Sequence, residues 1–520
     1  MENTLKEKSA LSGRAWDREY SKADGVFATL LLAVGFLFWE LVSAFRPGAG
    51  TVVFTAVVCT VAAFYMNRRG CRQNKRSLVC LGVMVLSVSI FLIFDSGLEK
   101  ELNLLFIMAA FIYWVALTTE CTIENRLSEY AAVDMIHQTF SRGIANLPCL
   151  LYILIRRTRQ RKGGKGTAAA LLGIAVMVPV LFAVTILLVR ADPAFQHLIE
   201  GVRRAVSEDV LIYVWYFVLG IPVACYLCGL IWGSAEKKPK VPEKSAVDGA
   251  MQRLRIVPAT AVSSGLAGLN LVYAVFFLAQ TSYLFSAFRQ MLPENMTYAE
   301  YARHGFFELC AVSAINLAVI FAAKLLSQKT SGKLLRIEIM LLSVFTIALT
   351  VIDISKMVLY IQSYGLTRLR IYTSIFMVFL FAVFLIILLG QIKPFNGGRA
   401  VILAALICFF GLCFGNVDGQ IAKYNMGQYL DGKLALMDRA SMEELSDGAV
   451  PYLYEAYQKT GNREDAYVLY CAIAGDPVTN MLPERTLEMI PAAEKEGFKT
   501  FNLQQYRAEK IRREIKPPVA

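Results

Sequence analysis

The sequence is poor in histidine. Its three histidines, His137, His197 and His304, lie far apart along the chain. Protein metal centres usually draw their imidazole ligands from short, characteristic spacings. A metal centre built on histidine is therefore not expected.

Motifs for enzymatic chemistry are also lacking. The chain has no HExxH motif of a zinc protease and no GxSxG on a strand-to-helix turn. The segment 163–167, Gly-Gly-Lys-Gly-Thr, resembles a phosphate-binding loop only superficially, because the required Gly-Lys-Ser/Thr order and upstream glycine are missing. We interpret it as a flexible basic linker. The sequence therefore predicts no catalytic residue, no metal site and no cofactor.

The positions of the cysteines argue against a disulfide framework. Most of the eleven cysteines fall within apolar stretches, and only Cys471 lies in the predicted external tail. Cys225 and Cys228 have the spacing of a metal or redox pair, but no second pair accompanies them. We interpret both as small packing residues of a membrane helix.

Long apolar stretches dominate what the chain does contain. Hydrophobic residues make up 56% of it, and the mean hydropathy is +0.49, far above the values of soluble domains. A helix needs about 20 apolar residues to cross a bilayer. We expect an all-α, polytopic transmembrane helix bundle of about 11 spans. They are placed approximately at 26–45, 51–66, 77–94, 103–119, 167–189, 209–232, 256–285, 305–327, 335–355, 371–391 and 400–416.

The loops between these stretches alternate in basic content. With the polar segment 1–25 in the cytoplasm, the loops on its side hold 30 of the 53 Lys and Arg residues, the opposite loops hold 10, and the C-terminal tail holds 13. Cytoplasmic loops of membrane proteins carry such an excess. The pattern predicts an N-terminus inside and a C-terminus outside. It also attributes the net charge of +12 to orientation and to anionic lipid head groups, with no nucleic-acid partner.

Two segments lie outside the simple bundle. Within the transmembrane domain, 26–416, the segment 120–162 contains the apolar run 147–155, which is too short to span. Basic residues follow that run, so we expect a helix at the cytoplasmic interface. After residue 416 the hydropathy falls, and helical spacing with a capping box at Ser441 predicts a small helical extracytoplasmic domain, 417–520.

Ionisable residues within membrane helices are costly and usually functional. The predicted topology places seven charged or titratable residues at the outer ends of the eighth, ninth and tenth spans: Arg303, His304, Glu308, Asp353, Lys356, Arg368 and Arg370. We predict that they converge in an outward-facing vestibule whose surplus positive charge suits a small anionic ligand or a lipid head group. The alternative is a set of interfacial ion pairs and snorkelling side chains. Glu338, Asn270 and Asn316 are further polar residues within the spans.

Two of these segments carry a resemblance. Residues 292–308, Leu-Pro-Glu-Asn-Met-Thr-Tyr-Ala-Glu-Tyr-Ala-Arg-His-Gly-Phe-Phe-Glu, resemble the central motif of a family of bacterial multi-pass membrane proteins, domain of unknown function 4173. Residues 364–370, Tyr-Gly-Leu-Thr-Arg-Leu-Arg, resemble its second motif, and 191–195 and 422–425 fit it more loosely. The resemblance runs from about residue 170 to 450 and implies a bacterial cytoplasmic membrane protein without an established activity.

Three function classes remain open at this stage. Transport, or the handling of a lipid or anionic ligand, would explain the many spans and the polar vestibule. An envelope sensor, regulator or scaffold would explain the external helical domain. A membrane-embedded enzyme would need a catalytic constellation that the sequence does not supply. Clustered polar side chains lining one cavity would favour transport, and a closed apolar bundle with a grooved external domain would favour sensing.

Overall fold

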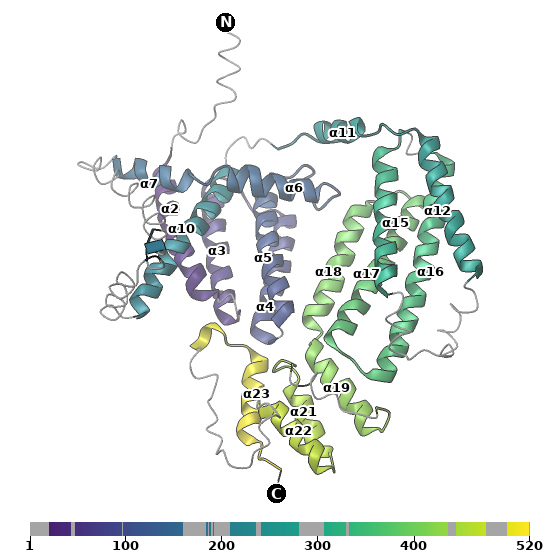
Figure 1. The fold of residues 1–520 in the computed structure, drawn as a ribbon. Coiled ribbons are helices and arrows are strands. Elements are labelled where there is room, and N and C mark those ends of the chain that lie inside the picture. Colours follow the sequence, from purple (N-terminus) through teal and green to yellow (C-terminus); the bar gives the residue numbers. More distant parts are fainter. Residues whose placement is uncertain are drawn as a thin grey trace.

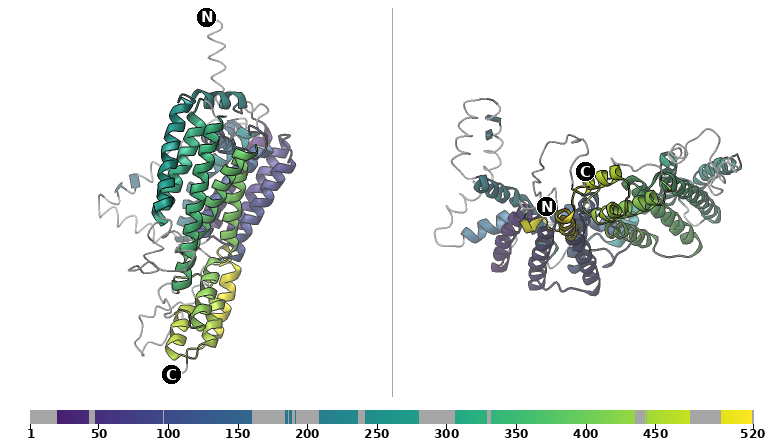
Figure 2. Two further views of the ribbon diagram at one scale, coloured as in Figure 1. Left: turned by 90° about the vertical axis from the view of Figure 1, so that its right-hand side faces the viewer. Right: turned by 90° about the horizontal axis from the view of Figure 1, so that it is seen from below.

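The computed structural model shows a helical protein whose long helices stand side by side (Figures 1 and 2). The residues that the structure describes are 20–42, 47–95, 97–159, 184–185, 187–188, 191, 208–235, 241–279, 306–328, 332–434, 442, 444–474 and 497–518. No strand occurs among them, apart from an isolated bridge between Val257 and Ser327. The predicted all-α fold class is therefore confirmed.

Nine helices within these ranges are long and apolar enough to cross a membrane. They are α2 (Lys22–Leu41), α3 (Ala49–Arg68), α4 (Lys75–Ile93), α5 (Gly97–Thr118), α10 (Glu208–Ser234), α12 (Ala259–Ala279), α16 (Lys333–Tyr364), α17 (Arg368–Ile392) and α18 (Gly397–Phe414). A further helix, α15 (Phe306–Leu326), contains a shorter apolar stretch, Cys310–Leu326. The protein is a multi-pass membrane helix bundle.

Ten of the eleven predicted spans coincide with these helices. The shortest of them, 51–66, corresponds to α3, which is 20 residues long and therefore of sufficient length to cross. The predicted span 167–189 lies almost wholly outside the described residues. The total of eleven crossings stays a prediction.

Short helices lie at both ends of the bundle. At one end α6 (Ala131–His137), the π-helix η2 (Gln138–Ile144), α7 (Cys149–Arg159) and α11 (Lys244–Arg253) lie across the long helices (Figure 1). The predicted interfacial run 147–155 forms most of α7, which has only 11 residues. At the opposite end lie α19 (Val417–Leu430), α21 (Val450–Lys459), α22 (Arg463–Ala474), the 3-10 turn η3 (Gly497–Lys499) and α23 (Leu503–Glu514).

The long helices form two groups with separate apolar cores. The first core joins α2, α3, α4, α5, α7 and α10, and it includes the buried Cys225 and Cys228, as their interpretation as packing residues predicts. The second core joins α12, α15, α16 and α17 around Leu266, Leu342 and Phe384. The two groups meet where α5 approaches α18, with the rings of Phe106 and Phe409 5.1 Å apart.

Helices α2 and α10 cross at a pair of glycines. A Cβ atom on Gly35 would lie 2.2 Å from the carbonyl oxygen of Gly220, so no side chain fits at this crossing. Removing both side chains lets the two backbones approach closely, as small residues do in membrane helix pairs. Pro222 lies two residues beyond the crossing, and α10 continues through it. The neighbouring helices support the interrupted hydrogen-bond ladder there.

The helices after residue 416 form a small domain with its own core, built on residues such as Ala422, Leu453 and Leu469. The domain is docked on the first helix group through Gln504, whose side chain accepts from the backbone N–H of Asp95 at 2.8 Å. Lys499 adds an ion pair with Glu40 of α2. The described part of 417–520 is therefore helical, as predicted. Its placement outside the membrane stays a prediction.

A candidate functional site along α16

Helix α16 carries a row of polar side chains on one face. Glu338, Thr346, Thr350, Asp353 and Lys356 are all buried, with 0 to 7% of each residue exposed. At about 100° per residue, these positions fall within one side of the helix. Since α16 is 32 residues long, or about 48 Å, this row lies inside a membrane-crossing helix. We call these five residues the polar face of α16.

The first end of the polar face is held by α12. The Oε2 atom of Glu338 accepts a hydrogen bond from the hydroxyl of Ser263 at 2.7 Å. Asn270 donates its Nδ2 to the backbone oxygen of Glu338 at 3.1 Å. The Oδ1 atom of Asn270 is buried and has no hydrogen-bond partner within the described ranges. A buried acceptor of this kind is costly unless a donor such as a water or a ligand reaches it.

The middle of the polar face is connected to α15. Asn316 of α15 is fully buried and donates its Nδ2 to the hydroxyl oxygen of Thr346 at 2.8 Å. Its Oδ1 accepts from the hydroxyl of Tyr273 on α12 at 2.9 Å. Three helices therefore contribute to one hydrogen-bonded unit. Such interhelical bonds hold polar groups that would otherwise be unsatisfied in hydrocarbon.

The second end of the polar face holds an ion pair. The Nζ atom of Lys356 lies 4.0 Å from Oδ1 of Asp353, one turn earlier on the same helix. Both side chains are less than a tenth exposed. Ionisable residues buried within membrane helices are rare, so this buried pair is a candidate functional site.

The seven predicted vestibule residues have different surroundings. Arg303 and His304 lie outside the described residues. Glu308 is exposed on α15, while Asp353 and Lys356 form the buried pair on α16. Their convergence into one vestibule stays a prediction, because the structure describes only five of the seven.

The two arginines of the predicted cluster hold the start of α17. Arg368 forms a two-pronged ion pair with Asp418 of α19, with N···O distances of 2.6 and 2.7 Å. Arg370 donates to the carbonyl oxygens of Tyr364 and Gly365, and its guanidinium stands 4.0 Å from the centre of the Tyr360 ring. Asp418 was not among the predicted residues. Its presence removes much of the surplus positive charge that the sequence indicated.

The turn between α16 and α17 is clamped by Asn425. The Oδ1 atom of Asn425 accepts from the backbone N–H of Leu366 at 2.6 Å, and its Nδ2 donates to the carbonyl of the same residue at 2.8 Å. Gly365 adopts a φ of 76°, and a Cβ there would lie 2.5 Å from the Asn425 amide, so both geometry and space require glycine. The motif segments 364–370 and 422–425 therefore meet in the fold.

The electrostatics of this clamp centre on Asp418. The residue is 1% exposed, and burial by itself would raise the pKa of its carboxyl. Hydrogen bonds from Arg368 and from the backbone N–H of Ser446 outweigh burial and hold the pKa of Asp418 below its ordinary value. The carboxylate is therefore ionised at neutral pH and ties the small domain to the second helix group.

The arrangement suits the passage or binding of polar groups better than catalysis. Glu338 and Asp353 are about 22 Å apart along the helix axis, at about 1.5 Å per residue, so they cannot act on one bond together. Within the described ranges, no three His, Cys, Asp or Glu residues are grouped to hold a metal ion. A row of hydroxyl, amide and ionisable groups is the type of lining found along ion and substrate pathways.

The comparisons with known proteins identify one family. The model of the domain of unknown function DUF4153 matches residues 80–456, which include both helix groups in large part and α19. The sequence motifs had indicated a different number, 4173, for a domain whose function is likewise not known. No curated protein and no solved structure matches the chain.

Proposed function

The chain belongs to the family of the domain of unknown function DUF4153, and we propose that it is a membrane transporter that uses the polar face of α16 as its pathway. The observation that carries this proposal is the burial of Glu338, Asp353 and Lys356 within one apolar helix. Ionisable residues inside a membrane are costly, and ion and substrate pathways are among the uses that retain them.

The polar face favours a transport cycle that includes protons. Glu338 and Asp353 are carboxyl groups that can each take up and release a proton. Ser263 is hydrogen-bonded to Glu338, and Asn316 and Thr346 form a second hydrogen-bonded unit between the two carboxyl groups. Lys356 supplies the positive charge for a small anionic ligand at the end that the charge pattern places outside. We therefore propose an outward-facing entrance near Asp353 and Lys356, in a bacterial cytoplasmic membrane.

Proton uptake by reconstituted protein tests this proposal. The full chain would be placed in vesicles that contain the pH-sensitive dye pyranine, and an inward proton gradient would be applied. We expect uptake faster than in empty vesicles, and a fall of at least about tenfold in Glu338→Gln and Asp353→Asn, the factor that about 1.4 kcal/mol of barrier produces. Glu101→Gln is the matched control, because Glu101 is an exposed carboxylate of α5 away from the polar face.

One result would contradict transport itself, and two others would contradict the use of the polar face. The first is wild-type uptake no faster than that of empty vesicles. The second is unchanged uptake in both polar-face variants when they elute as the wild type does in size-exclusion chromatography. A fall in uptake in Glu101→Gln as large as that in the other two variants would also remove the polar face from the pathway.

A sensor of the cell envelope is the second candidate function. It is favoured by the small C-terminal domain, which contacts the first helix group through Gln504 and the second through Asp418 and Asn425. A change in the distance between the two helix groups would therefore alter the contacts of this domain. A protein with this function alone would give no proton uptake, so the same vesicle assay separates the two candidates.

A further inference from the structure

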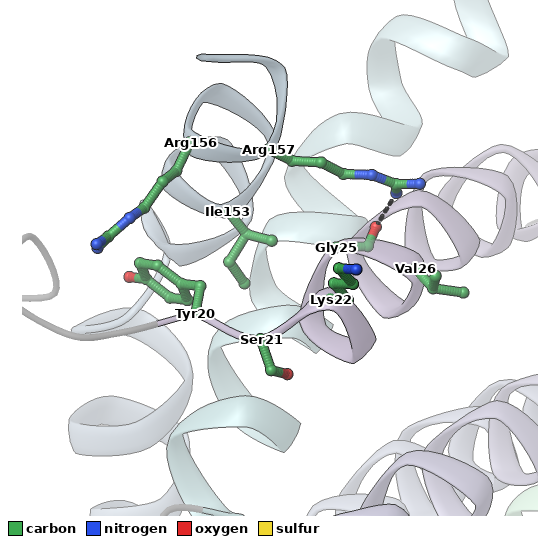
Figure 3. Close-up of a pocket in the computed structure, with 8 residues that line it drawn as sticks. All are labelled: Tyr20, Ser21, Lys22, Gly25, Val26, Ile153, Arg156 and Arg157. Atoms are coloured by element: carbon green, nitrogen blue, oxygen red, sulfur yellow. Dashed lines mark hydrogen bonds between the residues drawn. The ribbon is translucent and has the colours of Figure 1, made fainter. Parts of the chain in front are cut away.

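A basic pocket lies at the end of the bundle opposite to the C-terminal domain. It has a volume of about 430 Å³ and lies between α7 and the first turn of α2. Figure 3 shows Arg156 and Arg157 extending from α7 on either side of Ile153, with Tyr20 and Lys22 at the start of α2. The pocket is separate from the polar face of α16, and the proposal below does not depend on transport.

The lining of this pocket is cationic. Lys22, Arg156 and Arg157 contribute three positive charges, and no carboxylate is among the described residues that line it. Among the described residues near the pocket, Asp24 is acidic but fully buried, and its Oδ1 accepts from the hydroxyl of Tyr65 at 2.7 Å and from Arg69, while its Oδ2 accepts from the backbone N–H of Ser21 at 2.7 Å. The field inside the pocket therefore attracts an anion.

Arg157 is fixed in place by contacts with α2. Arg157 donates to the carbonyl oxygen of Gly25 at 2.5 Å and to the hydroxyl of Thr29 at 2.9 Å. It joins α7 to α2 and supplies a permanent charge at the wall of the pocket. Lys22 and Arg156 come from the two different helices, and the hydroxyl groups of Tyr20 and Ser21 add hydrogen-bonding groups beside them. Phosphate oxygens are the acceptors that such a set binds best.

The surroundings of the pocket are those of a membrane interface. Helix α7 buries Leu150 and Ile153 against the bundle and exposes Arg156 and Arg157, and it lies across the ends of the long helices (Figure 1). Val26 lines the pocket and is 51% exposed, and Leu30, one turn further along α2, is 43% exposed. A polar pocket that continues into an exposed apolar helix surface matches a phosphate group joined to acyl chains.

We propose that this pocket binds the phosphodiester head group of an anionic phospholipid. Lys22 and Arg156 contact the phosphate oxygens, and the acyl chains lie along Val26 and Leu30. Free phosphate is negatively charged like the head group but has no acyl chains that could pack on the apolar surface. The bound lipid holds α7 against α2 and thereby sets how deeply this end of the bundle lies in the membrane.

Lipid binding to the full chain in detergent micelles tests the proposal. The anisotropy of a fluorescent phosphatidylglycerol would be followed as protein is added, with unlabelled phosphatidylglycerol, phosphatidylcholine or inorganic phosphate as competitors. We expect displacement by phosphatidylglycerol alone. The double variant Lys22→Gln with Arg156→Gln should bind at least about tenfold more weakly, since each lost charge-assisted bond contributes about that factor.

Two further double variants serve as controls in this binding experiment. Arg72→Gln with Lys75→Gln removes two exposed charges from the same end of the bundle and should leave affinity within about twofold, because neither residue lines the pocket. Lys22→Arg with Arg156→Lys keeps the charge and should retain binding, which separates lost recognition from misfolding.

Three outcomes would overturn the proposal. One is equal displacement by phosphatidylcholine, which would show that charge is not recognised. Another is displacement by inorganic phosphate at concentrations comparable with those of the lipid, which would make the pocket a site for a free anion. The third is an equal loss of affinity in the control variant at Arg72 and Lys75, which would attribute binding to the net charge of this end.

Discussion

Asp418 shows how a single buried carboxylate can join two parts of the molecule. Its carboxyl accepts from Arg368 and from the backbone of Ser446, which are far apart in the sequence. These bonds lower the pKa of Asp418 in the folded protein. A lowered pKa means that ionisation of this group contributes stability above the ordinary carboxyl pKa of about 3.9, and that this contribution is lost as the pH falls through the folded value.

This linkage predicts the pH dependence of one variant. Asp418→Asn should unfold at a lower temperature than the wild type at pH 7. The expected loss in the free energy of unfolding is on the order of 1–3 kcal/mol. The difference should shrink as the pH falls below the ordinary carboxyl pKa of about 3.9 and vanish below the lower pKa of folded Asp418, where the folded wild-type carboxylate is protonated too. Thermal unfolding of the full chain in detergent at several pH values measures it.

The matched control lies in the same domain. Glu455 pairs with Lys459 at the surface, and hydrogen bonding and charge from this lysine lower its pKa too, but both side chains are more than half exposed. Glu455→Gln should therefore leave the unfolding temperature nearly unchanged at every pH. A pH-independent loss of stability in Asp418→Asn would show that the carboxylate charge is not what holds the clamp.

The individual polar residues were partly predictable, but their assembly was not. Glu338, Asp353 and Asn316 stand out in the sequence because each is a polar residue in an apolar stretch. Ser263 and Tyr273 do not stand out, since serine and tyrosine are common in membrane helices and the sequence does not show that their hydroxyl groups bond to other helices. The partnership of these residues depends on which helices are neighbours, and hydropathy carries no information on that.

At the scale of elements, the crossing of α2 and α10 is the most demanding contact. Gly35→Ala adds a Cβ that would lie 2.2 Å from a backbone oxygen, so the two helices must separate. We expect a loss of about 1–3 kcal/mol in the free energy of unfolding, the usual cost of overpacking. Thermal unfolding or resistance to denaturant in detergent measures it.

Gly82→Ala in α4 is the control for this prediction. A Cβ there has no atom of the described residues within 4 Å, and alanine favours a helix over glycine. The variant should be as stable as the wild type or slightly more so. If Gly35→Ala behaved in the same way, α2 and α10 would not pack as closely as the structure indicates.

The positions of the long helices were largely predicted, although α16 ends nine residues after its predicted span and α5 begins six residues before its own. Their close contacts were not predicted. Long apolar runs bounded by charge define helices such as α4 and α17 from the sequence alone. Ser264 and Gly268, with Ala261 and Gly265, give the seventh predicted span a face of small residues, a pattern that favours close helix packing. A Cβ at Gly265 or Gly268 nevertheless meets no atom within 4 Å in the described part of the chain. The close approach occurs at Gly35 and Gly220 instead, because packing partners are set by the whole fold.

At the scale of the whole molecule, the two ends of the bundle have opposite character. The basic pocket and α7 lie at one end, and the C-terminal domain lies at the other (Figure 1). The excess of Lys and Arg in the loops predicts that the basic end faces the cytoplasm. An alkaline phosphatase fused after Ala520 should therefore be active, and a green fluorescent protein at the same position should be dark.

Fusions within loops extend this prediction. A phosphatase fused after Arg72, between α3 and α4, should be inactive, because this loop lies at the predicted cytoplasmic end. The opposite pattern at both positions would invert the whole assignment. If both Ala520 and Arg72 were found in the cytoplasm, the number of membrane crossings between them would differ from the predicted one.

The length of the polar face has a consequence for depth. From Glu338 to Lys356 it extends about 27 Å at about 1.5 Å per residue, close to the roughly 30 Å thickness of the hydrocarbon core. If its two ends mark the two boundaries of that core, the unit of Tyr273, Asn316 and Thr346 sits at the bilayer midplane. That is the depth at which secondary transporters hold their substrates, equally far from both aqueous phases.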